Sequence, residues 1–300
     1  MVRIDPLSPI DVSIIIRTKD EERWIGTCLD GVFSQDHPVN VEIIVVDSGS
    51  TDRTLEICRR YPVNILAIPA ESFTYSHALN LGFRHAKAPL VISLSAHAIP
   101  ADGNWLGKLV ESLGDPEVAG ACSREVPMGG ADPYEMRRIK AIFCRGGNGP
   151  SREEFRSVPG NGIVIFSNVS SCIRKAVWEK CNFIEVPYAE DGFWAKEAIR
   201  KGHVIVYEPA SVVRHSHNEP LGDRVGRELK VLSARWIAEG KRPGITAEAL
   251  RGFGRFVVYT FSALDKTRSL GEWVYWMMYF ARKEILVMRC VLGMRGSGPR

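Results

Sequence analysis

A regular alternation of short β-branched runs with amphipathic stretches constrains the fold of this chain more than any other feature. Four apolar runs within the first 95 residues are of the kind that a parallel sheet buries on both faces. The runs predicted as strands are residues 12–16, 41–46, 65–68 and 90–94, and helices are predicted at 22–34, 52–60 and 75–86. This order predicts an α/β fold with a doubly wound, mostly parallel sheet.

The second half of the chain shows a weaker version of the same pattern. Residues 128–162 are rich in Gly, Pro and Arg, which predicts a long loop. The elements predicted after that loop are strands at 163–166 and 204–207 and helices at 175–180 and 191–201.

Charge divides the chain into two predicted regions. Residues 221–300 carry 15 basic and 7 acidic side chains, or +8, whereas residues 1–220 carry 24 basic and 28 acidic ones, or −4. We therefore expect an α/β domain over 1–220 and a basic helical C-terminal extension over 221–300. The aromatic run 273–281 with its basic neighbours suits either a helix at a membrane surface or a helix packed against the domain.

Cysteine usage and hydropathy indicate the compartment. The seven cysteines are scattered and form no C-x-x-C pair, which is typical of a reducing environment. The N-terminus lacks the pattern of a signal peptide, and no run of about 18 apolar residues predicts a spanning helix. We expect a cytoplasmic protein, peripheral on the inner membrane face if the extension binds lipid.

Polar residues follow each predicted strand of the first half, where open α/β sheets bind their ligands. These segments are residues 17–21, 47–52, 69–75 and 95–97. The carboxylate of Asp47 can accept hydrogen bonds from a nucleobase or ribose, whereas Asp52 suits the cap of the next helix. The sequence contains no P-loop, dinucleotide, zincin or α/β-hydrolase motif, which disfavours those chemistries.

Two other groups of residues could carry chemistry. Glu190 and Asp191 precede an amphipathic helix, where carboxylates act either as caps or as a general base. His97, His215 and His217 follow predicted strands and could meet at a divalent metal, although a histidine at a strand end commonly just completes hydrogen bonds.

Five segments together resemble the family-2 inverting glycosyltransferases of GT-A fold, and two of them resemble its bacterial rhamnosyltransferase-like branch. The first three are VSIIIRTKDEE (12–22), IIVVDSGSTD (43–52) and YAEDGFW (188–194); the branch is marked by FTYSHALNLG (73–82) and LVISLSAHAIP (90–100). The resemblance spans about residues 10–220 and implies a GT-A-like nucleotide-sugar-binding and catalytic domain there.

The resemblance implies a role for each matching residue. Asp191, preceded by Glu190, falls on the catalytic base, and Trp194 falls on the acceptor side. His215 or His217 falls on a late histidine near metal and diphosphate, and Arg214 is a candidate to neutralise the diphosphate. The residues implied to bind the nucleotide are Arg17, Thr18, Lys19, Glu21, Asp47, Ser76 and Asn80.

One departure from the family concerns the metal. The family places an Asp-x-Asp-like motif after the fourth strand, and here that place reads Ser95-Ala96-His97. Imidazole can ligate Mn²⁺, although carboxylates suit Mn²⁺ and Mg²⁺ better. A divalent Mn²⁺ or Mg²⁺ site is therefore expected only in an altered form, with histidine ligands or with cationic side chains in its place.

The resemblance implies an inverting enzyme that moves a sugar from a nucleotide-diphosphate donor to an acceptor hydroxyl, in polysaccharide or glycolipid synthesis. The expected partners are that donor, a saccharide or lipid-linked acceptor and a membrane surface reached by the C-terminal helices, but not nucleic acid. Two alternatives are a non-catalytic nucleotide-sugar-binding or scaffold protein and a nucleotidyltransferase. The second would need glycine in the loop 17–21, which has none.

Overall fold

The computed structural model of the chain forms two compact units, residues 1–186 with 190–218 and residues 187–189 with 219–300. The structure describes residues 2–5, 7–144, 149–160, 164–186 and 188–217, together with Arg227, Met277, Met278, Ala281 and Ile285. The predicted boundary at 220/221 and all but five residues of the expected helical extension lie outside the described residues and stay predictions. Within the described part of the chain, no helix is long and apolar enough to cross a membrane.

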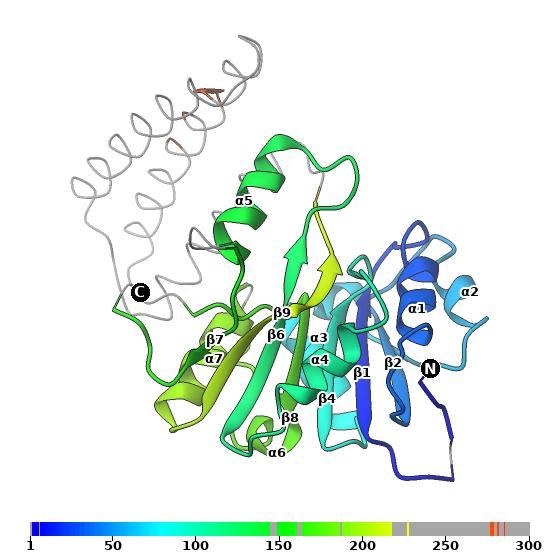
Figure 1. Ribbon diagram of the computed structural model, residues 1–300. Helices are drawn as coiled ribbons and strands as arrows, with labels where there is room; N and C mark the ends of the chain where they lie inside the picture. The colour runs from blue at the N-terminus through cyan, green and yellow to red at the C-terminus, as the bar shows by residue number, and fades with distance from the viewer. Residues whose placement is uncertain are drawn as a thin grey trace, which may run out of the picture. The chain divides into compact units, whose positions relative to one another are not determined.

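The first half of the sheet follows the predicted alternation (Figure 1). Its elements are β1 (Val12–Thr18), α1 (Ile25–Phe33), β2 (Val41–Asp47), α2 (Thr54–Cys58), β3 (Asn64–Ala67), η1 (Ala70–Ser72), α3 (Tyr75–His85) and β4 (Leu90–Ser95). Each predicted strand is present within two residues of its expected ends. The α3 helix begins at a side-chain cap, because the Thr74 hydroxyl accepts from the backbone N–H of His77.

The second half departs further from the sequence-based expectation. Its elements are β5 (Ile99–Pro100), α4 (Trp105–Glu111), β6 (Val118–Val126), α5 (Pro133–Phe143), β7 (Glu153–Phe155), β8 (Ser170–Arg174), α6 (Lys175–Trp178), α7 (Glu190–Arg200) and β9 (Val204–Arg214). The long β6 was not anticipated, and α5 and β7 lie within the segment expected to be a loop.

The strand expected at 163–166 is wrong, because residues 164–167 have no regular structure. Ile165 and Phe166 are buried in the core without joining the sheet. The strand at this place is β8, whose buried serine hydroxyls are satisfied internally: Ser170 accepts from the Trp105 indole at 2.8 Å and Ser171 donates to Asn168 at 2.9 Å. Such paired hydroxyls let a polar sequence form a central strand.

The described strands form one mixed sheet in the order β3-β2-β1-β4-β8-β6-β9-β5, with β7 beside β9. The first four strands are mutually parallel, whereas β8 is antiparallel to both β4 and β6. The β6 and β9 strands are parallel, and β9 runs antiparallel to β5 and β7. The predicted α/β fold is therefore confirmed, with a sheet that is more mixed than expected beyond β4.

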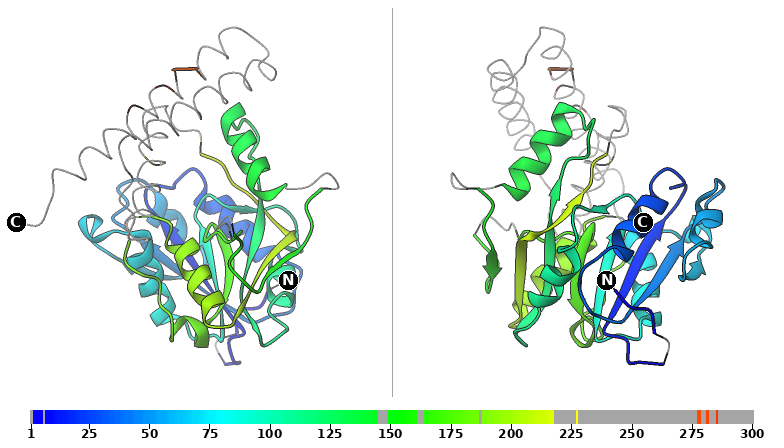
Figure 2. Two further views of the ribbon diagram at one scale, coloured as in Figure 1. Left: turned by 90° about the vertical axis from the view of Figure 1, so that its left-hand side faces the viewer. Right: turned by 45° about the vertical axis from the view of Figure 1, so that its right-hand side comes forward.

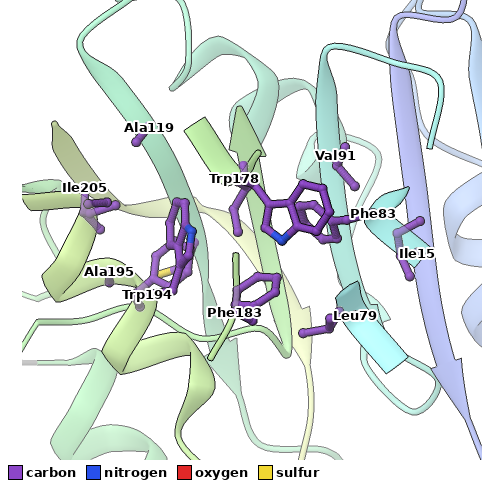
Figure 3. Packing of buried hydrophobic residues seen from close by; sticks show 14 of the residues in the cluster. Ile15, Leu79, Phe83, Val91, Ala119, Trp178, Phe183, Trp194, Ala195 and Ile205 are labelled. Atoms are coloured by element: carbon purple, nitrogen blue, oxygen red, sulfur yellow. The ribbon is translucent and has the colours of Figure 1, made fainter. Parts of the chain in front are cut away.

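Helices cover both faces of the sheet (Figure 2). Side chains of β1 alternate between the two: Ile14 and Ile16 pack with α1 and α4, whereas Ile15 packs with α3 on the opposite face (Figure 3). The α3 helix approaches β1 closely at Gly82, where a Cβ atom would lie 2.4 Å from Cγ2 of Ile15. Glycine at this position therefore sets the distance between helix and sheet.

The parallel strands bring their carboxyl ends to one edge. In the sheet register Thr18 lies beside Asp47, and Arg17 lies beside Ser95. The α5 helix lies beyond the ends of β6 and β9 at the same edge (Figures 1 and 2). The polar segments that follow β1, β2 and β4 are thereby gathered at one end of the sheet.

Candidate active site at the carboxyl edge of the sheet

The loops after β1 and β2 are joined by reciprocal hydrogen bonds. The backbone N–H of Asp20 donates to the Ser50 hydroxyl at 2.9 Å, and the Asp20 carboxylate accepts from the backbone N–H of Thr51 at 2.7 Å. The Asp52 carboxylate accepts from the backbone N–H of Glu22 at 2.9 Å. Asp20 adopts a positive φ of 52° to make this contact, a conformation that Asp tolerates better than most residues. The two loops form one rim.

Asp47 is 2% exposed and supports its own turn. One carboxylate oxygen accepts from the backbone N–H groups of Gly49 and Ser50, both at 3.0 Å, and the other accepts from the Ser50 hydroxyl. The Asp52 carboxylate accepts from the backbone N–H of Thr54 at 2.9 Å, which agrees with its expected structural role. Asp47 therefore has a structural role of its own, while its contact with a nucleoside stays a prediction.

The end of β1 presents polar atoms that lack a partner within the described part of the chain. Nε of Arg17 and Oγ1 of Thr18 are buried without a hydrogen bond there. The Arg17 guanidinium lies over the ring of Tyr75, 5.2 Å from its centroid, whereas Lys19 is exposed. Because buried polar atoms are rarely left unpaired, Arg17 and Thr18 mark a place suited to a polar ligand.

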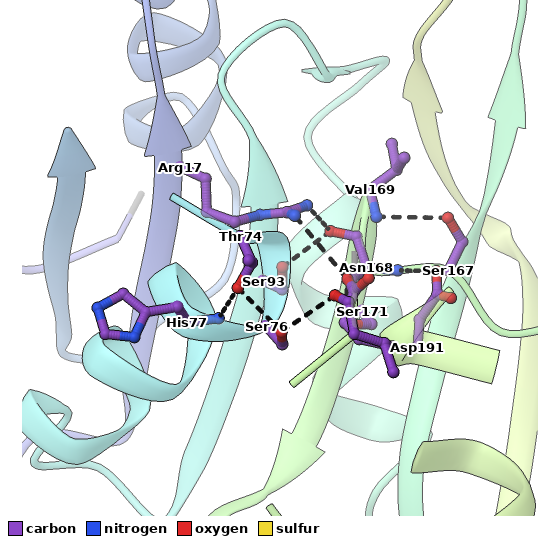
Figure 4. Close-up of polar contacts among 12 residues, drawn as sticks. Arg17, Thr74, Ser76, His77, Ser93, Ser167, Asn168, Val169, Ser171 and Asp191 are labelled. Carbon is purple, nitrogen blue, oxygen red and sulfur yellow. Dashed lines mark hydrogen bonds and ion pairs between the residues drawn. The ribbon is translucent and has the colours of Figure 1, made fainter. Parts of the chain in front are cut away.

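Arg17 connects the end of β1 to the start of α7 (Figure 4). Its Nη2 donates to the backbone carbonyl of Asn168 at 2.9 Å, and its Nη1 lies 3.9 Å from Oε1 of Glu190. Asn168 donates through its side chain to Glu190 and through its backbone N–H to Asp191, both at 3.3 Å. Asn168 was not anticipated, since nothing in its spacing separates it from an ordinary loop asparagine.

The pKa of Asp191 is raised to about 7, chiefly because burial disfavours its charge and further because Glu190 is negative. The backbone N–H groups of Gly192 and Asn168 and the Arg17 guanidinium act in the opposite direction without cancelling this effect. Asp191 stands in the first turn of α7 and accepts from the N–H of Gly192 at 2.7 Å. A carboxyl group that titrates near neutral pH is suited to general base catalysis.

The three candidate metal-binding histidines lie together. The ligating atoms of His97, His215 and His217 are all within 4.8 Å of one another. The rings of His97 and His215 are stacked with centroids 5.0 Å apart, and the His217 ring stands edge-on to both at 4.9 and 4.6 Å. The topology explains this meeting, because His97 follows β4 while His215 and His217 follow β9.

Two carboxylates contact the imidazoles of His97 and His215. Nδ1 of His97 is 2.6 Å from Oε1 of Glu21, and Nδ1 of His215 is 2.8 Å from Oε2 of Glu125. Glu21, expected to contact the nucleotide, instead orients His97, while its backbone N–H donates to the Thr54 hydroxyl at 2.7 Å. Glu125 was missed because its strand, β6, was not predicted. Burial lowers the pKa of His215, and its contact with Glu125 lowers the pKa of that carboxyl.

A short segment before β8 joins the histidines to Asp191. The Ser167 hydroxyl donates to Oε1 of Glu125 at 2.8 Å, and the next residue, Asn168, contacts Asp191 through its backbone N–H. One polar chain therefore runs from His215 through Glu125, Ser167 and Asn168 to Asp191. The histidine cluster and the carboxyl group with the raised pKa belong to one site.

Two of the residues expected at the site, Trp194 and Asn80, are packed into the core instead. Trp194 lies among the buried core residues (Figure 3). It is 2% exposed, and its ring centroid is 5.3 Å from that of Phe166. The reason is helical spacing, since Trp194 and Ala198 lie on the buried face of α7. Asn80 donates to the Phe183 carbonyl at 2.8 Å, and its carboxamide oxygen accepts from the indole of Trp178 at 3.2 Å. Both therefore hold the core together.

Ser76 and Arg214 are also placed differently from the expectation. Ser76 is fully buried, and its hydroxyl donates to the carbonyl of Val186 at 3.4 Å. Arg214 is exposed at the end of β9, while its neighbours Val213 and His215 are buried. Because successive side chains of a strand point to opposite faces, Arg214 points away from the histidine cluster. Its contact with a diphosphate stays a prediction.

Comparison with known proteins supports the same family as the motifs. The sequence pattern of the family described as Glycosyl transferase family 2 matches residues 13–180, which is more than half of the chain. The chain belongs to glycosyl transferase family 2. The resemblance noted from the sequence is thereby confirmed, and so is the prediction of a glycosyltransferase.

Two relatives of this family 2 chain are named for polysaccharide synthesis. An O-antigen chain rhamnosyltransferase of Salmonella typhimurium is 32% identical over 216 residues, which cover 69% of this chain and 67% of that protein. An O-antigen chain rhamnosyltransferase of Salmonella anatum is 32% identical over 180 residues, covering 59% of this chain and 57% of the relative. The chain thus matches between half and two thirds of their lengths.

Solved structures confirm the GT-A fold of this family 2 protein. A mannosyltransferase from Pyrobaculum calidifontis, in complex with GDP-Man and Mn²⁺, is similar with a TM-score of 0.62 and 21% identity over 97% of this chain and 89% of that one. Glucosyl-3-phosphoglycerate synthase from Mycobacterium tuberculosis, in complex with Mn²⁺, UDP and glucosyl-3-phosphoglycerate, gives a TM-score of 0.57 at 18% identity, covering 78% and 81% of the two chains.

Proposed function

We propose that this family 2 glycosyltransferase moves a sugar, with rhamnose as the first candidate, from a nucleoside-diphosphate donor to a hydroxyl group of a saccharide or lipid-linked acceptor, with inversion. The observation that carries the proposal is the polar chain that links Asp191, through Asn168 and Ser167, to the histidine cluster. The names of the Salmonella relatives supply the candidate sugar and the polysaccharide context.

Asp191 acts as the general base in this proposal. Its carboxylate takes the proton of the acceptor hydroxyl while the hydroxyl oxygen attacks the anomeric carbon of the donor. The bond from that carbon to the diphosphate breaks on the opposite face, and the diphosphate leaves with the bonding electron pair. Arg17 holds the backbone of Asn168 and lies near Glu190, so it positions the start of α7 for this step.

The histidine cluster is the part of the site suited to a divalent cation. Two of its buried ring nitrogens, Nε2 of His97 and Nε2 of His215, have no hydrogen-bond partner among the described residues, which fits atoms that would ligate an ion. Bound there, a divalent ion would neutralise charge on the leaving diphosphate. Thr18 and Asp47 would face the nucleoside from the neighbouring strand ends.

The basic extension over residues 221–300 would bring the enzyme to the cytoplasmic membrane surface, where a lipid-linked acceptor resides. Its charge of +8 supports this part of the proposal. Sedimentation of the full chain with anionic phospholipid vesicles tests it, and replacement of Arg282 and Lys283 by Glu should reduce the bound fraction. Equal binding of the charge-reversed variant would contradict the proposal.

The central experiment is a transfer assay with a panel of nucleoside-diphosphate sugars that includes rhamnose donors. Asp191→Asn should lower turnover by roughly 10²–10⁴-fold while donor binding stays intact. The matched control is Glu197→Gln, which removes a carboxylate of α7 that pairs only with Arg200 and Lys201 among its described contacts. Donor binding without hydrolysis or transfer of any sugar would favour the non-catalytic alternative.

A further inference from the structure

The histidine cluster offers a set of donor atoms that is unusual for a Mg²⁺ site. All three groups that converge are imidazoles, from His97, His215 and His217. Two carboxylates, those of Glu21 and Glu125, contact the Nδ1 atoms of His97 and His215. The described residues at this place therefore direct nitrogen, and not carboxylate oxygen, toward the common centre.

The hydrogen bonds to Glu21 and Glu125 determine which ring nitrogen is free. A neutral imidazole that donates its Nδ1 proton to a carboxylate carries a lone pair on Nε2. For His97 and His215 these Nε2 atoms are buried, without a partner among the described residues. In this neutral form the lone pair can bind a cation and cannot pair with a diphosphate oxygen, which is itself an acceptor. Two neutral imidazoles arranged in this way therefore suit a cation.

His217 completes the cluster from the segment after β9. Its backbone N–H donates to Oε1 of the fully buried Glu135 at 3.2 Å. Glu135 is held in turn by the guanidinium of Arg138 at 2.8 Å, so the first turn of α5 fixes the position of this histidine. A tetrahedral ion with bonds of about 2.1 Å keeps its nitrogen ligands roughly 3.4 Å apart. The ligating atoms lie within 4.8 Å of one another, so they would have to approach by up to about 1.4 Å to reach this spacing.

The chemistry of the donors identifies the class of ion. Imidazole suits zinc, cobalt and iron, whereas Mg²⁺ and Ca²⁺ prefer oxygen ligands. Carboxylates behind two of the imidazoles are the common support of such sites, where they fix the tautomer and raise the basicity of the ligand. Three protein ligands also leave an open coordination position, as in catalytic zinc sites.

We propose that His97, His215 and His217 bind one transition-metal ion of the zinc and cobalt class in preference to Mg²⁺, with Glu21 and Glu125 as positioning residues. This inference adds the class of metal ion to the proposed function. It rests on the proposed function in one respect only, namely that the open coordination position of the ion faces the diphosphate. It departs from the Mn²⁺ named in the solved complexes of similar fold. The expected order of affinity is Zn²⁺ and Co²⁺ above Mn²⁺, with Mg²⁺ far below.

Cobalt provides a test that does not depend on turnover. The full chain, stripped with chelator and dialysed, is titrated with Co²⁺ while the visible absorption of the ion is recorded, and Zn²⁺, Mn²⁺ and Mg²⁺ then compete. Zn²⁺ should abolish the cobalt spectrum at equimolar concentration, and millimolar Mg²⁺ should leave it unchanged. Displacement of Co²⁺ by Mg²⁺, or absence of any cobalt spectrum, would overturn the inference.

Variants assign the signal to these residues. His97→Ala should abolish the spectrum, and Glu21→Gln should weaken Co²⁺ binding by about 10–100-fold, as loss of a supporting carboxylate does elsewhere. The matched control is His85→Ala, an exposed histidine of α3 that should leave binding unchanged. Thermal unfolding identifies any variant that fails to fold. An unaltered spectrum in folded His97→Ala would refute the assignment.

The inference and the proposed function can fail separately. Transfer supported by Mg²⁺ without cobalt binding would overturn the inference and leave the function standing. Tight cobalt binding, with no turnover of any nucleoside-diphosphate sugar under any metal, would overturn the function and leave the metal site standing.

Discussion

The pH dependence of transfer should report the effect of the Glu190 charge on Asp191. The pKa of Asp191 is raised to about 7, so about one tenth of this carboxyl is ionised at pH 6 and about nine tenths at pH 8. If only the carboxylate accepts the acceptor proton, kcat/KM should rise about tenfold between these two pH values. This rise of kcat/KM with pH, called the limb below, lies in the range that ordinary buffers cover because the pKa of Asp191 is raised.

Glu190→Gln should move that limb to lower pH, because two effects of the substitution both lower the pKa of Asp191. The substitution removes a negative charge that disfavours ionisation of Asp191. It also frees Arg17, whose Nη1 lies 3.9 Å from Glu190, to favour the Asp191 carboxylate. Burial, the largest cause of the shift, persists, so the pKa should stay above 3.8. The ratio of kcat/KM at pH 8 to that at pH 6 should therefore fall from about ten toward one.

The assay is the initial rate of transfer at low donor concentration, measured from pH 5 to 9 at constant ionic strength. Glu197→Gln serves as the control, since it removes a charge from the same helix at a solvent-exposed position and should leave the limb in place. An unchanged limb in Glu190→Gln, or one displaced to higher pH, would refute the reasoning about Asp191.

Two further substitutions test the rim and the core. Asp47→Ala should weaken binding of free nucleoside diphosphate by about 1.5–3 kcal/mol in calorimetry. The comparison is Ser50→Ala, which removes the hydroxyl bonded to Asp47 and to the backbone N–H of Asp20 but keeps the Asp47 carboxylate, and which should not weaken binding to this extent. Equal affinities of Asp47→Ala and the unaltered chain would restrict Asp47 to its structural role. Gly82→Ala should lower the free energy of unfolding by about 1–3 kcal/mol in denaturant titration, because its Cβ would lie 2.4 Å from Ile15. A gain in stability from the better helix propensity of Ala would show that α3 can shift freely.

The sequence predicted the first half of the fold well because its strands are buried on both faces and read as unbroken β-branched runs. It failed at β8, where serines replace that signal, and at Ile165 and Phe166, which are buried without a strand. The mixed strand order beyond β4 depends on long-range pairing, which local pattern does not encode.

The grouping of the candidate residues was predicted better than the contacts that hold them. The meeting of the three histidines was anticipated from strand ends, and the structure places their ligating atoms together. The supports were not: Glu125 lies on the strand that pattern missed, and Asn168 lies in an irregular segment. Trp194 shows the opposite error, because a residue three positions from Asp191 along a helix points to the core.

The double attachment of Glu21 limits how this enzyme can be re-engineered. Its backbone N–H is held by Thr54, at the end of the loop that would face the nucleoside, while its carboxylate holds His97. A loop over residues 47–54 taken from another transferase would therefore alter the support of His97 together with the contacts proposed between this loop and the nucleoside. Under that proposed role, a change of base specificity calls for the two loops and His97 to be replaced as one unit.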